Sequence, residues 1–106
     1  MLTLNYTLNQ INDLVSGDFT HQASDLEIIN DVLIDSRRLA NPDNCLFIAL
    51  RSKRNDGHNY IAELYEKGVR NFILDHIPAN FSSYVQANVI LVKDTLKALQ
   101  KLAQYH

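Results

Sequence analysis

Apolar residues near the start of the chain recur with the spacing of one helix face, which predicts an amphipathic helix over residues 6–17. Thr7 followed three positions later by Gln10 is the sequence pattern of a capping box, so Thr7 is predicted to cap this helix. Gly17 is predicted to end it, because glycine is common just beyond a helix. The predicted buried face consists of Leu8, Ile11, Leu14 and Val15.

Four later segments carry the hydrophobic pattern of strands. The first, from Leu26 to Ile34, is apolar with polar interruptions, and turn-forming residues follow at Asn41–Asn44. The second, Cys45–Leu50, is apolar without a break, which is typical of a strand covered on both faces. The third and fourth are Val69–Leu74 and Val89–Val92.

Two more helices are predicted between and after these strands. His58–Lys67 has helical spacing and is followed by Gly68 as a stop, and Asp94 is predicted to cap a final helix. Because strands alternate with helices, the predicted fold is a small single α/β domain with a mixed or mostly parallel sheet flanked by helices. The apolar positions predicted for the last helix are Leu96, Leu99, Leu102 and Ala103.

Length and composition fit one folded domain and exclude several classes of function. With 106 residues, 46% of them hydrophobic, the chain can form one compact core. A formal net charge of −2 argues against a generic nucleic-acid-binding protein. The chain has no secretory signal pattern and no apolar run of the roughly 20 residues that span a bilayer, so we expect a cytoplasmic protein with no nucleic-acid or membrane partner.

Several common chemistries lack their sequence patterns. Cys45 is the one cysteine, so no intrachain disulfide is possible, and we expect it to lie in the core. The four histidines show no metal-ligand spacing, so no metal site is predicted. Neither GxxxxGK[ST] nor GxGxxG occurs, so the Gly-rich phosphate loops of ATP and dinucleotide sites are absent from the sequence.

Basic residues gather in one short part of the chain. No lysine or arginine precedes Arg37, and five of the ten basic residues lie between positions 37 and 54. This cluster favours an anionic ligand, although a solvated charge run is the commoner origin of such a pattern. The five residues are Arg37, Arg38, Arg51, Lys53 and Arg54.

Two polar segments, Asp35–Arg37 and Ser52–His58, each follow a predicted strand. In open α/β sheets ligands bind beyond the carboxyl ends of the strands, so the two segments are expected to meet if the strands are parallel. The second segment leads into a helix, whose free N–H groups favour an anion such as a pyrophosphate. Lys53 and Arg54 would add hydrogen bonds to phosphate oxygens, and the Ser36 hydroxyl would pair with a base or sugar.

Each of these residues also has a purely structural interpretation. Asp56 before a helix is most often its N-cap, and a structural salt bridge is the alternative role of Asp35 and Arg37. His58 in a first helical turn is expected to be exposed. Tyr60 is expected to pack between helix and sheet rather than to form a stacking platform for nucleic acid.

The pattern resembles the N-terminal domain of Mur ligases. The resemblance is carried by Asp35–Arg37, Pro42, Leu46–Leu50, Asp56–His58 and Gly68, and it extends over the whole chain. Within the family, it is greatest to members that add D-alanyl-D-alanine to a UDP-muramoyl-tripeptide, including forms fused to an alanine racemase. The chain departs from the family pattern at Asp43–Asn44 and at Ser52, where glycine is common. The tail carries the likeness through Val89–Val92 and Asp94–Leu99.

The resemblance implies a substrate-binding role. It implies that residues 1–106 are one UDP-muramoyl-peptide-binding domain, an excerpt of a longer ligase, without catalytic residues, cofactor or metal of its own. The parent ligase would use ATP and Mg²⁺ in further domains of the same chain, an ATP-binding and a C-terminal domain, and pyridoxal phosphate if a racemase is fused. The uridine side of the pocket would consist of Ile34, Ser36 and Arg37, and the loop over the nucleotide of Lys53, Arg54, Asn55, Asp56 and Gly57.

Other functions stay open at this point. The N-terminal domain of the Mur ligases that add diaminopimelate or lysine is the first alternative. A non-catalytic module whose basic stretch binds an acidic protein is a second alternative. A stand-alone hydrolase that uses Asp35, Asp56 and His58 is the third, and the sequence offers it no recognisable nucleophile.

Overall fold

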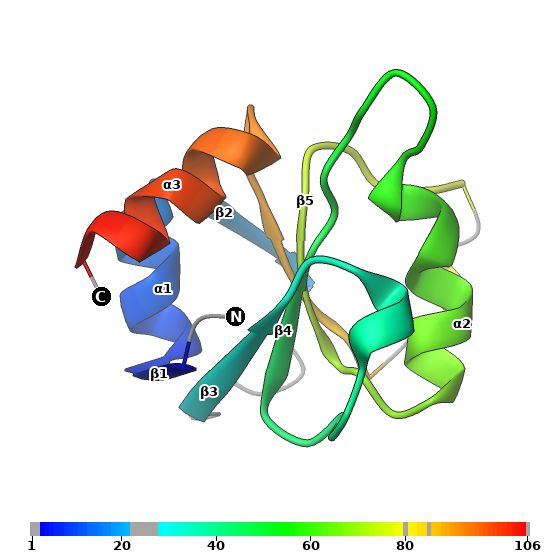
Figure 1. Cartoon of the computed structure of the whole chain (residues 1–106), viewed down its shortest axis with the longest axis horizontal. Coiled ribbons are helices and arrows are strands. Elements are labelled where there is room, and N and C mark those ends of the chain that lie inside the picture. Colours follow the sequence, from blue (N-terminus) through cyan, green and yellow to red (C-terminus); the bar gives the residue numbers. More distant parts are fainter. Residues whose placement is uncertain (1–2, 22–27, 80, 85, 106) are drawn as a thin grey trace.

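Six strands form one mixed sheet in the computed structural model, which describes residues 3–21, 28–79, 81–84 and 86–105 (Figure 1). The order across the sheet is β1-β3-β4-β5-β6-β2. The four central strands are parallel, and each outer strand is antiparallel to its neighbour. The central strands are β3 (Ile28–Leu33), β4 (Cys45–Ile48), β5 (Asn71–Leu74) and β6 (Asn88–Leu91), and the outer ones are β1 (Thr3–Thr7) and β2 (Asp18–His21). The predicted α/β class is confirmed.

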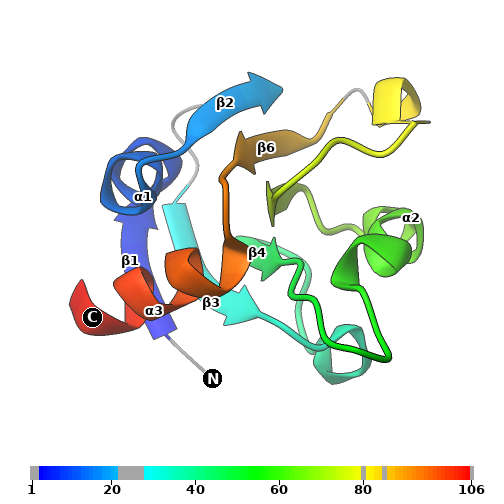
Figure 2. The same ribbon diagram turned by 90° about the horizontal axis from the view of Figure 1, so that it is seen from above.

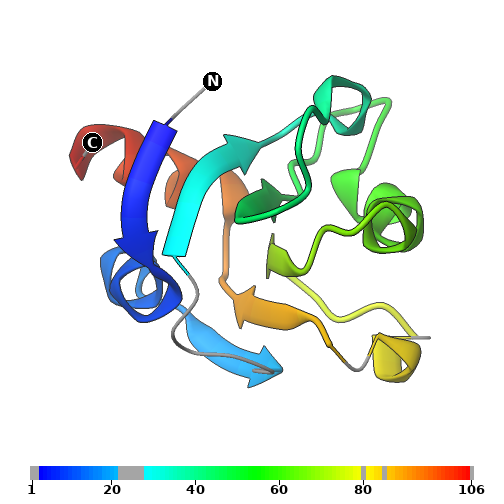
Figure 3. The same cartoon turned by 90° about the horizontal axis from the view of Figure 1, so that it is seen from below.

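The hydrophobic pattern does not predict the two outer strands. Each is short, and each pairs with a strand distant in sequence, as Tyr6 with Ile29 and Phe19 with Ile90 show. Figure 3 shows β1 and β2 at opposite edges of the sheet, with helix α1 (Leu8–Val15) between them in the chain. Because β1 extends to Thr7, the first helix is shorter than the predicted 6–17. Leu26, assigned to the first predicted strand, lies outside the described residues.

Buried side chains of the central strands alternate between two cores. Leu46 and Ile48 face α1 and α3 (Thr95–Tyr105), whereas Phe47 faces α2 (Ile61–Glu66). Figures 1 and 2 show α1 and α3 together on one side of the sheet and α2 on the other. Every residue of β4 and β5 is buried, so the predicted strands covered on both faces are confirmed.

Helix α1 begins as predicted and ends differently. Both hydrogen bonds of the Thr7–Gln10 capping box are present, at 3.2 and 2.9 Å. The left-handed residue at its end is Ser16, with φ of 54°, and not Gly17. Gly17 has a steric reason to be glycine: a Cβ there would lie 2.3 Å from Ile90 Cγ2.

Helix α3 is capped as predicted, but the face that it buries differs from the predicted face. The Asp94 carboxylate accepts the Lys97 N–H at 3.1 Å. The buried face of the helix is formed by Thr95, Ala98 and Leu102, whereas the predicted core residue Leu96 is 52% exposed. Ala103, also predicted to be apolar core, is exposed. Within the described residues, no helix is long and apolar enough to cross a membrane.

The segment before α2 is held against β4 by a close backbone approach. A one-turn 3₁₀ helix, η2 (Gly57–Tyr60), precedes α2, and Gly68 ends α2 as predicted, with φ of 108°. A Cβ on Gly57 would lie 2.9 Å from both Ala49 Cα and Leu50 N, which real contacts do not allow. Gly57 therefore brings the start of η2 beside the end of β4.

This approach predicts the effect of enlarging Gly57. Gly57→Ala should lower the free energy of unfolding by about 1–3 kcal/mol, because the added methyl group pushes η2 away from β4. Urea denaturation of the 106-residue chain measures the change. Asn59→Ala, an exposed position in the same turn, is the matched control and should stay within about 0.5 kcal/mol of the wild type. Equal stability of Gly57→Ala and wild type would contradict the packing described here.

Candidate functional site

A pocket of about 440 Å³ lies where the chain leaves β3 and β4. We call it the strand-end pocket. Its volume is in the range of small-molecule sites. Five residues predicted to bind the ligand line it, namely Ile34, Ser36, Arg37, Asn55 and Gly57. The others that line it are Asp35, Phe47, Leu50, Arg51, Ser52 and Tyr60.

Residues 51–56 form a closed hairpin at one side of this pocket. Ser52 N–H donates to the Asn55 carbonyl at 2.7 Å, and Gly57 N–H donates to the Leu50 carbonyl at 2.7 Å. Arg51 and Asp56 pair as an antiparallel bridge. Lys53 and Arg54 lie exposed at the tip, and neither lines the pocket. Their predicted contact with phosphates stays a prediction.

The Asp56 carboxylate is paired with groups of the protein itself. It accepts the His58 backbone N–H at 3.0 Å and lies 2.6 Å from Nδ1 of the His58 ring. Burial raises the pKa of Asp56, but the hydrogen bonds from His58 outweigh it and bring the pKa below its ordinary value. The structural interpretation of Asp56 as the N-cap of the following turn is confirmed, and Asp56 does not line the pocket.

The start of this helix does not offer the free N–H groups that were predicted to bind an anion. The free N–H groups that would have bound a pyrophosphate are already paired: Gly57 with Leu50, and both His58 and Asn59 with Asp56. The helix also starts as a single 3₁₀ turn rather than a full α-helical turn. Positive charge at the pocket therefore comes from side chains and not from the helix end.

His58 is buried, contrary to its predicted exposure, with 7% of its surface accessible. Its Nε2 accepts the Asp75 backbone N–H at 3.2 Å, which assigns the ring proton to Nδ1, facing Asp56. The two ring nitrogens thus join the loop after β4 to the residue after β5. The sequence shows Asp56 and His58 as neighbours but gives no sign of the Asp75 contact, because it depends on strand pairing.

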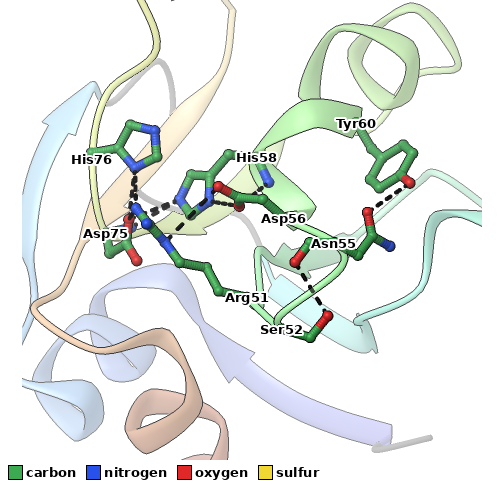
Figure 4. Close-up of polar contacts among 8 residues, drawn as sticks. All are labelled: Arg51, Ser52, Asn55, Asp56, His58, Tyr60, Asp75 and His76. Atoms are coloured by element: carbon green, nitrogen blue, oxygen red, sulfur yellow. Dashed lines mark hydrogen bonds and ion pairs between the residues drawn. The ribbon is translucent and has the colours of Figure 1, made fainter.

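The Arg51 side chain belongs to a cluster of polar side chains at the end of β5 (Figure 4). Its Nη2 lies 2.7 Å from Asp75 Oδ1 and 2.8 Å from His76 Nδ1, and His76 stacks on His58 with ring centroids 4.1 Å apart. Ligand atoms of His58, Asp75 and His76 lie within 4.8 Å of one another, a grouping that the sequence spacing does not reveal. The Arg51 guanidinium already places a positive charge beside the Asp75 carboxylate. Burial raises the pKa of Asp75, but the hydrogen bonds from Arg51 and His76 outweigh it and bring the pKa below its ordinary value.

Asp35 and Arg37 form the ion pair that the sequence allowed. Arg37 Nε and Nη2 donate to the two carboxylate oxygens at 3.0 and 2.9 Å. These bonds, with the Arg37 backbone N–H, lower the pKa of Asp35 to about 2. The Arg37 side chain is nevertheless 87% exposed, so it is available to a ligand at the rim of the pocket. Arg38 lies 3.9 Å from Asp35 and does not line the pocket.

Tyr60 has a second role beside the packing predicted for it. Its ring is half-buried against the core on the α2 side of the sheet, and its hydroxyl donates to Asn55 Oδ1 at 2.9 Å inside the pocket lining. Across the pocket, the Ser36 hydroxyl has no hydrogen-bond partner among the described residues. The sequence feature that could have indicated this second role is the position of Tyr60, three residues after Gly57 in the turn beside β4.

These groups suit binding better than catalysis. Ile34, Phe47 and Leu50 offer apolar surface, a hydroxyl and an amide offer hydrogen bonds, and arginines lie at the rim. Asp35, Asp56 and His58, proposed above for a hydrolase, do not form one site, since only Asp35 lines the pocket. The fold and the pocket define a small α/β domain with a pocket at its strand ends.

A second pocket, of about 650 Å³, lies beside α3. We call it the α3 pocket. Its charges are balanced, because three lysines and three aspartates line it, and it contains none of the residues predicted to bind a ligand. The lining includes Val92, Lys93, Lys97, Ala98 and Lys101.

Comparison with known proteins assigns a family. A profile described as "Mur ligase family, catalytic domain" matches residues 28–106. The chain is 34% identical over 99 residues to the UDP-N-acetylmuramoyl-tripeptide–D-alanyl-D-alanine ligase of Bacillus subtilis, covering 92% of this chain and 21% of that protein. It is 35% identical over 96 residues to the UDP-N-acetylmuramoyl-L-alanyl-D-glutamate–2,6-diaminopimelate ligase of Clostridioides difficile, covering 89% of this chain and 19% of that one.

A solved structure agrees with the sequence comparison. The UDP-N-acetylmuramoylalanyl-D-glutamyl-2,6-diaminopimelate–D-alanyl-D-alanyl ligase of Acinetobacter baumannii superposes with a TM-score of 0.80 at 25% identity, covering 99% of this chain and 22% of that one. The chain belongs to the Mur ligase family, as the resemblance implied. It spans about a fifth of the length of the curated relatives it matches.

The lowered carboxyl pKa values predict acid sensitivity. Asp35, Asp56 and Asp75 stabilise the fold while ionised, so their contribution is present above the ordinary pKa of 3.8 and is lost as the pH falls below it. The free energy of unfolding, measured with urea between pH 5 and pH 2, should fall towards the acid end. Asp75→Asn should flatten this slope. A variant with the wild-type slope would show that the Arg51–Asp75 contact contributes nothing.

Proposed function

We propose that residues 1–106 form a domain that binds the nucleotide end of a UDP-N-acetylmuramoyl-peptide. The single observation that carries this proposal is the strand-end pocket, in which the segment after β3 meets the hairpin after β4. The pocket combines apolar surface for a base with the Ser36 hydroxyl and the Asn55 amide as polar partners. The names of the relatives support the choice of ligand, since each contains UDP-N-acetylmuramoyl.

In this proposal, the uridine lies against Ile34, Ser36 and Arg37, and the diphosphate points towards the hairpin tip. Lys53 and Arg54 are exposed there and supply charge-assisted hydrogen bonds to phosphate oxygens. Asn55 and Gly57 form the hairpin wall of the pocket, and Asp56 acts through the loop by capping η2. The domain holds its substrate in place, and positioning of this kind lowers the barrier to a reaction completed by other residues.

We further propose that the whole protein is an ATP-dependent ligase of peptidoglycan synthesis that forms an amide bond to D-alanyl-D-alanine in the cytoplasm. The B. subtilis relative carries that activity in its name, as do relatives from Treponema pallidum and Escherichia coli, at 37% and 29% identity. ATP and Mg²⁺ would bind to an ATP-binding domain of the same chain, which acts with a C-terminal domain. A fused alanine racemase with pyridoxal phosphate is part of the same proposal and rests on the sequence resemblance alone.

Addition of diaminopimelate is the second candidate. The 35% identity to the C. difficile ligase, whose name states that activity, favours it about as strongly as the 34% identity to the B. subtilis ligase favours the first. Both activities need the same UDP-N-acetylmuramoyl group at this domain. The choice between them therefore does not affect the site proposed here.

Removal of the Ser36 hydroxyl tests the proposed site. In a UDP titration of the ¹⁵N-labelled chain, backbone signals of Ser36, Arg37, Asn55 and Gly57 should shift. Ser36→Ala should raise the Kd about fivefold, the value of one neutral hydrogen bond.

Gln100→Ala, an exposed position on α3, is the control and should leave the Kd unchanged. Shifts confined to residues of the α3 pocket, or a Ser36→Ala variant that binds UDP as tightly as the wild type, would overturn this placement.

A further inference from the structure

The amide of Asn55 lies at the pocket wall in a fixed position. Its backbone carbonyl accepts from the Ser52 N–H at 2.7 Å and from the Ser52 hydroxyl at 3.4 Å, so the hairpin holds its Cα in place. Its side chain lines the strand-end pocket and is exposed to it. The group that faces a ligand there is therefore one end of a carboxamide, which is either a donor or an acceptor according to its rotation.

Tyr60 contacts one end of this amide. Its hydroxyl donates to Asn55 Oδ1 at 2.9 Å, and its ring is packed against the core, so the hydroxyl is anchored. Figure 4 shows the Asn55 amide nitrogen on the side away from this hydroxyl. Among the described residues, the Nδ2 group has no hydrogen-bond partner. Its two N–H donors are consequently the part of the amide left for a ligand.

We propose that Asn55, oriented by Tyr60, selects uracil over cytosine in the strand-end pocket. This inference rests on the proposed function and adds a specificity-determining residue to it. Uracil carries a carbonyl oxygen at position 4, the same acceptor that thymine shows, whereas cytosine carries an amino donor there. The Nδ2 group donates to the carbonyl, but it meets the cytosine amino group donor to donor. A site built around a donor rejects the ligand that leaves it unpaired.

The experiment compares UDP with CDP, because the two ligands share the diphosphate and ribose. Contacts to those groups cancel in the ratio of the two Kd values, and the ratio reports on the base alone. Isothermal titration of the 106-residue chain should give a Kd for CDP at least about tenfold above that for UDP.

Two variants separate the orientation of the Asn55 amide from its capacity to donate hydrogen bonds. Tyr60→Phe keeps the ring and its packing but frees the amide to invert, so the preference for UDP should fall to about twofold or less, mainly through tighter binding of CDP. Asn55→Asp replaces the donor by a carboxylate that only accepts, so the preference should reverse in favour of CDP.

Tyr65→Phe is the matched control. Tyr65 lies in α2, its hydroxyl accepts the Gln86 N–H, and it does not line the pocket, so the ratio should keep its wild-type value. Preserved UDP binding with the wild-type ratio in both Tyr60→Phe and Asn55→Asp would overturn this inference and leave the proposed function standing. A wild-type chain that binds neither nucleotide would overturn both.

Discussion

The parallel pairing of β3, β4 and β5 is the constraint on which the candidate site depends. Leu33 pairs with Phe47, and Ile48 pairs with Ile73, so the three strands end at one edge of the sheet. Burial of both faces fixes this register, because a slip of one residue would exchange the side chains of the two cores. The polar segments that follow the strands are brought together as a consequence, and the strand-end pocket lies between two of them.

Internal pairing determines which polar groups at this edge remain for a ligand. Asp56 caps η2 and bonds His58, and Asp75 is shared by Arg51, His58 and His76. These contacts join the loops after β4 and β5, and none of Asp56, His58, Asp75 and His76 lines the strand-end pocket. The polar groups at the pocket include the Ser36 hydroxyl, the Asn55 amide and the Asp35–Arg37 ion pair.

The sequence predicts the central part of the fold and misses its edges. An unbroken apolar run marks β4, and the Thr7–Gln10 pattern marks α1, because these features are local. β1 and β2 leave no local pattern, since each depends on a partner far along the chain. At the site, strand ends locate Ser36 and Asn55, but neither the burial of His58 nor the Tyr60–Asn55 contact is visible before the strands are paired.

The most direct test of the account is where the base of a bound nucleotide lies. An isotope-filtered nuclear Overhauser spectrum of the ¹³C-labelled chain with unlabelled UDP measures this through the uracil H5 and H6 protons. The account predicts contacts from these protons to the Ile34 methyl groups and the Tyr60 ring, which line the strand-end pocket. Contacts to Val92 and Ala98 of the α3 pocket, with none to Ile34, would contradict it.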